Sequence, residues 1–308
     1  MPRDYLQRLT LRIAAALGNW PEERRLREAD YFLRQQQPDG GWRGREGGSD
    51  VYYTGFALRS LAVLGALRGV PAERAAAFLR AKLTGRETIV DFLSLLMSGA
   101  LLDMSAGINI YAAADASWRD AVSNTLEQLR RPDGGYAKGM EGTLSSTYHS
   151  FLVLLCRELL ERPIPEPQRL VGFLLAQRAE EGGFLEIRAQ KRAGTNPTAA
   201  AIGALQMLDA LTPEIREETI DFLAEMQTDE GGLRANTRIP IADLLSTFTG
   251  LVTLTDLEGL AELDLRGLKQ FVKSLAQPAG GFSAAAWDPA GDVEYSFYGV
   301  GCMGLLGM

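Results

Sequence analysis

The residues with the clearest chemical potential lie in one short stretch, residues 231–250, which reads GGLRANTRIPIADLLSTFTG. Arg234 and Arg238 follow a pair of glycines, and Asp243 comes directly before an uncharged run. Arginine side chains bind phosphate groups well, because their N–H donors match the geometry of the oxygens. An aspartate that precedes an apolar helix is either the helix cap or a carboxylate that faces a cavity. We therefore take Arg234 and Arg238 as candidate ligands of an anion and Asp243 as a candidate catalytic residue, with capping as its alternative role.

Four other stretches, DVYYTGF, TLSSTYH, GTNPTAA and DVEYSFY, begin in a similar way. Each places a hydroxyl four residues after a residue type that suits a helix cap or first turn. Including the Asp243 stretch, the hydroxyls are Thr54, Thr147, Thr198, Thr247 and Ser296, and the residues four positions earlier are Asp50, Thr143, Gly194, Asp243 and Asp292. Aromatic side chains and the only histidine lie at the same level. We expect the substrate-binding residues to include Tyr52, Tyr148, His149, Phe248 and Tyr295. The alternatives are that some of these rings face outward and that the lone histidine is a packed, buried residue.

The loops that lead into these stretches are more basic than the chain as a whole. The chain has a net charge of −7 and a pI near 5.0, which argues against a nucleic-acid-binding surface. The two loops before Thr198 and Thr247 nevertheless carry Arg188, Lys191, Arg192, Arg234 and Arg238 against the single acid Glu186. Helix N-termini attract phosphate, so these loops predict an anion-binding rim. Ordinary solvated loop charge is the alternative.

A repeat of about 48 residues positions these side chains. The glycine pairs in PDGGW, PDGGY, EEGGF, DEGGL and PAGGF have their first glycines at positions 40, 134, 182, 231 and 280. The first interval is about twice the others, which predicts a copy near residue 87 that has lost its glycine pair and keeps only Gly85 in LTGRET. Glycine suits such a turn because it tolerates positive φ and close backbone approach.

Each repeat reads as two helices of different character. The helix before each glycine pair mixes charged and apolar residues, which predicts an outer helix with one buried stripe. Its apolar anchors are Phe32, Phe78, Leu126, Phe173, Phe222 and Phe271. The helix after each pair is almost free of charge, as in residues 196–208 and 244–255, which predicts burial on all sides. Six such pairs predict an all-α, single-domain (α/α)6 toroid over residues 1–308, with a central cavity. An extra helix at residues 4–17 is expected on the outside near the seam.

The remaining composition excludes several classes. Cys156 and Cys302 lie in apolar runs and are expected to be buried thiols without a disulfide or metal role. We see no signal peptide and no apolar stretch of 18 residues, so we expect a cytoplasmic protein without a transmembrane span.

The outer helix, [DE]GGF-like loop and apolar inner helix resemble the repeat of the prenyltransferase and squalene-cyclase family over residues 24–308. The β subunits of protein farnesyl- and geranylgeranyltransferases are the more similar branch. This resemblance implies an isoprenoid diphosphate bound inside the toroid, a zinc ion that activates a cysteine thiolate, and a helical α-subunit partner. Arg234 and Arg238 correspond to basic residues of the family that bind the diphosphate.

The family's zinc ligands are incomplete in this chain. The family motif D-x-C-Y-S-[FW] corresponds to Asp243-Leu244-Leu245-Ser246-Thr247-Phe248, so Leu245 replaces the cysteine. The motif Y-H-T corresponds to Tyr295-Ser296-Phe297, so Ser296 replaces the histidine. Zinc sites need three or four N, S or O donors, so we expect zinc to be absent. The resemblance also leaves Gly194, Ser145, Ser246 and Thr249 in place of a histidine, an arginine, a tyrosine and a tryptophan of the family site.

Three functional hypotheses follow. The first is a protein like the prenyltransferase β subunit that binds an isoprenoid diphosphate in an aromatic cavity without the zinc–thiolate chemistry. The second is a non-catalytic toroid that binds an apolar ligand or a protein partner. The third is another (α/α)6 enzyme that uses cavity carboxylates such as Asp50, Asp243 and Asp292. No DxDD or DDxxD motif is present, which argues against ordinary terpene cyclisation.

Overall fold

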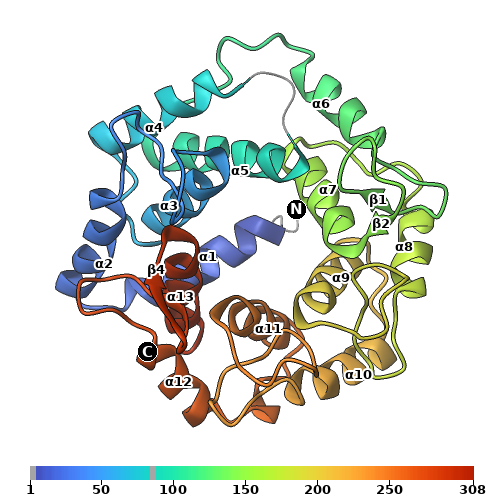
Figure 1. The fold of residues 1–308 in the computed structure, drawn as a ribbon. Helices are drawn as coiled ribbons and strands as arrows, with labels where there is room; N and C mark the ends of the chain where they lie inside the picture. Colours follow the sequence, from blue (N-terminus) through green and yellow to red (C-terminus); the bar gives the residue numbers. More distant parts are fainter. Residues whose placement is uncertain (1–4, 84–87) are drawn as a thin grey trace. The chain divides into compact units, whose positions relative to one another are not determined.

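The computed structural model describes residues 5–83 and 88–308 (Figure 1). The predicted loss of a glycine pair around Gly85 falls outside these residues. The chain divides into two compact units. The first contains the described residues of Met1–Val122 with Leu159–Glu161 and Leu275–Met308, and the second contains Ser123–Glu158 and Arg162–Ser274. Helices dominate both units, as the sequence predicts.

Within the described residues, each of the six predicted repeats contains an outer helix whose apolar anchor is buried. These helices are α2 (Glu22–Arg34), α4 (Gly69–Ala81), α6 (Trp118–Glu127), α8 (Pro167–Ala176), α10 (Pro213–Ala224) and α12 (Leu265–Ser274). All six predicted anchors are at most 5% exposed, so this part of the repeat is confirmed. A short 3-10 helix, η1 (Leu260–Glu262), precedes the last of these helices.

The inner helices follow the glycine loops and bury most of their side chains. They are α3 (Val51–Val63), α5 (Ile89–Ala106), α7 (Thr147–Leu159), α9 (Thr195–Met207), α11 (Leu244–Asp256) and α13 (Val293–Leu305). Two of the intervening loops contain small antiparallel hairpins, which pair β1 (Tyr136–Ala137) with β2 (Ser145–Ser146) and β3 (Ser283–Ala285) with β4 (Asp288–Gly291).

The glycine pairs join neighbouring repeats as well as making a turn. The first glycine has positive φ, and a side chain there would collide with the next outer helix. At Gly231, φ is +94° and an added Cβ would lie 2.3 Å from the carbonyl oxygen of Gly267. In the first four pairs the second glycine lies under the anchor phenylalanine of that helix; a Cβ on Gly232, for example, would be 2.4 Å from the Phe271 ring. Both glycines are therefore needed for close packing between repeats.

The recurring hydroxyls fasten each loop to its inner helix. The Thr247 hydroxyl accepts the backbone N–H of Leu233 at 2.9 Å. Thr54, Thr198 and Ser296 accept the equivalent loop amide at 2.9–3.0 Å. In the third repeat, this role belongs to Ser150, which accepts from Tyr136 at 2.9 Å.

The predicted register of the third repeat was therefore wrong. The Ser146 hydroxyl accepts the His149 N–H and caps α7, in place of the predicted Thr143. Thr147, which the sequence aligned with the recurring hydroxyls, instead donates its hydroxyl to the carbonyl oxygen of Leu185.

The first unit contains the packing of the last repeat against the first. Helix α13 packs on α3, and a Cβ on Gly281 would lie 2.5 Å from the Tyr31 ring of α2. Trp20 and Arg24 both donate to the carbonyl oxygen of Met308. Helix α1 (Tyr5–Gly18) lies at this seam, as predicted, but it packs on the inner helices α3 and α13. The prediction that it lies outside the helix pairs was wrong, because Ile13 and Leu17 are buried against α13 at Gly304.

Helix α5 corrects the expectation that the chain has no apolar stretch of 18 residues. It has 18 residues with a mean hydropathy of 1.6, so length and composition alone would let it cross a membrane. More than half of it is buried inside the fold, and it packs on α3. A buried core helix passes the same test, so this single helix is weak evidence for a membrane span.

Candidate functional site

Asp243 is the cap of α11. Its carboxylate accepts the Ser246 N–H at 2.7 Å and the Ser246 hydroxyl at 2.8 Å. Burial raises the pKa of this carboxyl, and the hydrogen bonds from Ser246 act in the opposite direction. Leu245, which follows in the first turn, offers no metal donor. The structure therefore shows the capping role of Asp243, and its catalytic role stays a prediction.

The other two proposed cavity acids are caps as well. Asp50 accepts the Tyr53 N–H at 2.8 Å, and Asp292 accepts the Tyr295 N–H at 2.9 Å. Asp292 also pairs with Arg45 at 3.0 Å. Capping alone thus explains why an aspartate stands directly before each of these three helices.

A basic pocket of about 330 Å³ lies in the second unit at the N-terminus of α9. Lys191, Arg192 and Arg238 supply its positive charge, and Glu186 is its acidic residue. The amides of Gln190, Asn196 and Asn236 complete its polar lining. The helix cap here is Gly194, which has no side chain to accept the first N–H groups. The Thr195 N–H donates to the Ala235 carbonyl oxygen at 2.9 Å and Pro197 has no N–H, so the helix start adds to the attraction for an anion through the positive end of its dipole.

The two predicted anion ligands separate in the structure. Arg238 lines the basic pocket. The Arg234 guanidinium instead donates to the Glu225 carbonyl oxygen at 3.1 Å, at the end of outer helix α10. The pocket also contains Lys191 and Arg192, which the sequence placed in the predicted anion-binding rim but not among the two named ligands. The sequence feature that could have identified them is a pair of basic residues shortly before the glycine that caps α9.

His149 and Tyr148 begin α7 in the same unit. The His149 Nδ1 lies 2.7 Å from the Ser146 hydroxyl, which also hydrogen-bonds to Glu186 of the basic pocket. Burial, and then the nearby Lys138, lower the pKa of His149, while burial raises the pKa of Glu186. Tyr148 meets the His149 ring edge-on, with 5.4 Å between the ring centres. The histidine is therefore connected to the pocket through Ser146, and it is not an isolated packed residue.

Tyr52 lies in an aromatic cluster of the first unit around Glu294. The hydroxyls of Tyr52 and Tyr298 donate to the same Glu294 oxygen, at 2.7 and 3.1 Å. The Phe56 ring packs against both tyrosines, with centres 5.0 and 5.4 Å apart. Burial raises the pKa of the Glu294 carboxyl. The sequence analysis missed Glu294, although an acid between a cap and two tyrosines was visible in DVEYSFY.

Two other predicted residues have different surroundings. Tyr295 lies under the Arg45 guanidinium, 5.5 Å from its ring centre, and that guanidinium pairs with Asp288 and Asp292. Phe248 is buried at 6% exposure within α11. Ser296 uses its hydroxyl to bind a loop amide. Over residues 5–83 and 88–308, no three His, Cys, Asp or Glu side chains come together in a way that could hold a metal ion.

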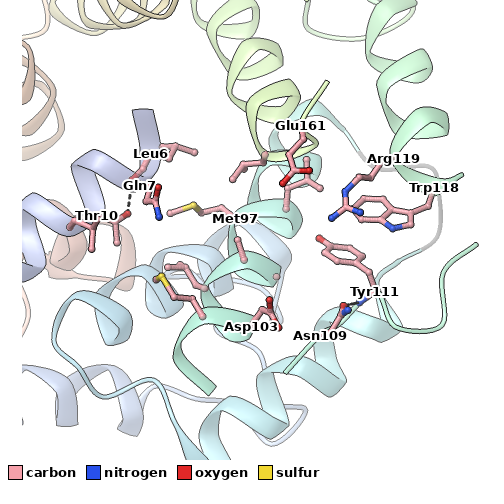
Figure 2. A pocket seen from close by; sticks show the side chains of 17 residues that line it. Leu6, Gln7, Thr10, Met97, Asp103, Asn109, Tyr111, Trp118, Arg119 and Glu161 are labelled. Carbon is pink, nitrogen blue, oxygen red and sulfur yellow. Dashed lines mark hydrogen bonds between the residues drawn. The ribbon is translucent and has the colours of Figure 1, made fainter. Parts of the chain in front are cut away.

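Another pocket, of about 460 Å³, lies in the first unit, and none of the predicted site residues lines it. Figure 2 shows Tyr111, Trp118 and Arg119 at one side and Gln7 and Thr10 of α1 at the other. The Tyr111 and Trp118 rings are stacked with 4.4 Å between their centres. Leucine and methionine side chains from α1 and α5 make the rest of its lining mainly apolar.

Comparisons with known proteins agree on the fold. A family model described as the prenyltransferase alpha-alpha toroid domain matches residues 9–96, 93–196 and 198–308. The protein farnesyltransferase subunit beta of Pisum sativum is 29% identical over 196 residues, which is 61% of this chain and 45% of that protein. The match thus spans less than half the length of this relative.

Solved structures give the same result. Candida albicans protein geranylgeranyltransferase-I, complexed with GGPP, has a TM-score of 0.72 at 16% identity and covers 91% of this chain and 90% of that chain. The type II terpene cyclase MstE from Scytonema, in complex with geranylgeranyl dihydroxybenzoate, has a TM-score of 0.61 at 14% identity and covers 98% of both chains. Such low identities show the fold alone. The predicted all-α toroid is confirmed.

Proposed function

The chain belongs to the prenyltransferase alpha-alpha toroid family, and on that premise we propose that it binds an isoprenoid diphosphate through the basic pocket at the start of α9. The observation that carries the proposal is the meeting of Lys191, Arg192 and Arg238 around about 330 Å³ of space, in a chain whose net charge is −7. A diphosphate carries several negative charges and many acceptor oxygens. It would use the side-chain donors together with the positive end of the helix dipole.

Binding of the isoprenoid chain is proposed for the aromatic cavity that the sequence predicted. The family relation supports this, because the geranylgeranyltransferase-I structure is a complex with GGPP. Tyr148, at the start of α7 in the same unit as the basic pocket, supplies suitable apolar surface. A helical α-subunit-like partner stays a prediction.

The proposed chemistry does not use zinc and a thiolate. Leu245 has no donor atom, and the Ser296 hydroxyl is already bonded to the Phe282 amide. Asp243 is then left as the single matching ligand, which is too few for a zinc site. Elemental analysis of the purified protein should find far less than one zinc ion per chain, and a stoichiometric zinc content would contradict this proposal.

The binding proposal is tested by calorimetric titration with geranylgeranyl diphosphate. The double variant Arg192→Ala/Arg238→Ala loses two charge-assisted contacts, each worth about 1.5–3 kcal/mol, so affinity should fall by at least about 100-fold. The matched control is Arg234→Ala, whose guanidinium binds the end of α10. It should keep its affinity within about threefold, since such contacts make no charge-assisted bond to the ligand.

Two results would overturn the assignment. If the double variant binds as tightly as the unaltered protein, the diphosphate lies elsewhere. If the unaltered protein does not bind the compound, isoprenoid diphosphate binding itself is wrong, and the hypothesis of a toroid with another ligand or a protein partner is preferred.

A further inference from the structure

A chain of hydrogen bonds runs from the basic pocket to the only histidine. Glu186 lines the pocket and hydrogen-bonds to the Ser146 hydroxyl. The same hydroxyl lies 2.7 Å from the His149 Nδ1 and accepts the His149 backbone N–H at 3.1 Å. All of these residues belong to the second unit, and Ser146 is buried.

The bonding capacity of Ser146 determines where the protons lie. A serine hydroxyl has one proton to donate and two lone pairs to accept. The His149 backbone N–H occupies one lone pair, and an ionised Glu186 takes the proton. The remaining lone pair can only accept, so His149 must donate from Nδ1. In this tautomer Nε2 is unprotonated, and no hydrogen bond with another described residue occupies it.

Two hydrogen bonds favour the ionised form of Glu186, and burial, the larger effect, acts against it. Burial raises the pKa of its carboxyl, but the Ser146 hydroxyl and the Tyr148 backbone N–H both donate to it and favour the charged form. Burial and the nearby Lys138 both disfavour the imidazolium form of His149. A neutral histidine with a free Nε2 is the form that accepts a proton.

We propose that His149 is a catalytic base that deprotonates a hydroxyl-bearing acceptor, with Ser146 and Glu186 as its positioning residues. This inference rests on the proposed function, because the acceptor would be prenylated by the isoprenoid diphosphate held in the adjoining pocket. It names an acceptor class, an alcohol or phenol, that the family's zinc–thiolate chemistry does not use.

The step balances without a further reactant. The bond between isoprenoid C1 and the diphosphate oxygen breaks, and its electron pair leaves with the diphosphate. A lone pair of the acceptor oxygen forms the new C1–O bond, and the O–H proton moves to Nε2 of His149. The imidazolium is stabilised through Ser146 by the Glu186 carboxylate and later returns its proton to water.

The type of acceptor follows from the type of base. A thiol is partly ionised near neutral pH, so its attack depends less on a neighbouring base. An alcohol or phenol holds its proton much more tightly, and the C–O bond cannot form stably until that proton leaves. General-base catalysis is most useful for such an acceptor, and a histidine has a pKa near the operating pH.

The relay is tested by NMR, because the single histidine gives one unambiguous set of imidazole signals. We expect the Nδ1–H tautomer above the pKa of His149. Glu186→Gln should lower that pKa, because the carboxylate that stabilises the imidazolium is lost. The matched control is Glu141→Gln, an exposed loop carboxylate of the same unit, which should leave the pKa unchanged. An Nε2–H tautomer, or an unchanged pKa in Glu186→Gln, would overturn the relay.

The reaction is tested with geranylgeranyl diphosphate and a simple phenol, with mass spectrometry of the products. We expect a geranylgeranyl phenyl ether, and a kcat that is lost as pH falls below the His149 pKa measured by NMR. His149→Gln should lower kcat by roughly 100-fold or more and remove this pH dependence. An unaltered protein that binds the diphosphate but forms no ether overturns the acceptor class, whereas absent binding overturns the proposed function. The NMR result tests the relay in either case.

Discussion

At the scale of single residues, position at a helix start does not distinguish a structural acid from a functional one. Asp50, Asp243 and Asp292 all accept the N–H three residues ahead. Glu186 and Glu294 are not N-cap residues, and their carboxylates accept hydroxyl protons from Ser146, Tyr52 and Tyr298.

The pH dependence of stability tests the capping role of Asp243. Burial raises its folded-state pKa above the ordinary value of about 4. Its contribution to stability is therefore fully present below that ordinary value and is lost as pH rises through the raised pKa. Asp243→Asn keeps an oxygen that accepts the Ser246 N–H but cannot ionise. Its free energy of unfolding, relative to the unaltered protein, should increase between pH 4 and pH 7.

The measurement is urea unfolding, followed by circular dichroism at several pH values. Asp243→Ala serves as the comparison, because it loses the cap and should be less stable by about 0.5–2 kcal/mol. An asparagine variant that loses stability as strongly as the alanine variant at pH 7 would show that the charge of Asp243 stabilises the fold.

The residues of the basic pocket show what sequence reasoning could and could not reach. The excess of basic residues in the loops before α9 and α11 was visible, and it led to the correct pair of loops. The sequence did not show which of Arg234 and Arg238 lines the pocket. That depends on the folded loop, in which the Arg234 guanidinium donates to the Glu225 carbonyl oxygen. The hydrogen bonds that connect His149 to Glu186 through Ser146 join two different repeats. No local sequence pattern could therefore predict them.

At the scale of elements, the glycine pairs fix the spacing between repeats. Gly231→Ala would place a Cβ 2.3 Å from the Gly267 carbonyl oxygen, on a residue with φ of +94°. Strain at positive φ and overpacking together should lower the free energy of unfolding by roughly 2–4 kcal/mol. Thermal unfolding of the purified variant measures this loss.

Gly172→Ala is the matched control for this substitution. Gly172 lies inside α8 with nothing within 4 Å of an added Cβ. Alanine is about 0.5–1 kcal/mol better than glycine in a helix, so this variant should be more stable than the unaltered protein. Equal effects at the two positions would show that close packing between repeats is not what Gly231 provides.

The elements themselves were largely predictable, and the exception has a clear cause. A period of about 48 residues and a change from mixed to apolar helices located the helix pairs. The third repeat failed in register because Thr143, Ser145, Ser146, Thr147 and Ser150 are all hydroxyl residues near one helix start. Several choices then fit the pattern equally, and only the hydrogen bond from Tyr136 to Ser150 decides between them.

At the scale of the whole molecule, the first unit joins segments that are far apart in the sequence. Helix α13 packs on α1 and α3, and Trp20 and Arg24 bind the carbonyl oxygen of Met308. The predicted toroid of six helix pairs implied contact between repeats six and one. The sequence did not predict that α1 would pack on these inner helices, because an amphipathic pattern does not identify its partner.

Replacing one tryptophan tests how much the contacts between the last and the first repeat contribute to the free energy of unfolding. Trp20 is 8% exposed and its indole donates to the Met308 carbonyl, so Trp20→Ala should cost about 3–5 kcal/mol. Trp287 is 66% exposed, and Trp287→Ala should change stability by no more than about 0.5 kcal/mol. Urea unfolding monitored by circular dichroism gives both values. Similar small losses in the two variants would mean that the seam contributes little to the stability of the chain.

The hydroxyl that fastens each loop has a consequence for how this protein can change. The Leu233 amide is held by Thr247, and the Asp243 cap holds the helix start, so both ends of the fifth loop are fixed by the framework. The exposed residues 238–241 between these points can then vary in composition without disturbing the helices on either side. Selection, natural or in the laboratory, can therefore explore new ligands by randomising this segment while the scaffold stays constant.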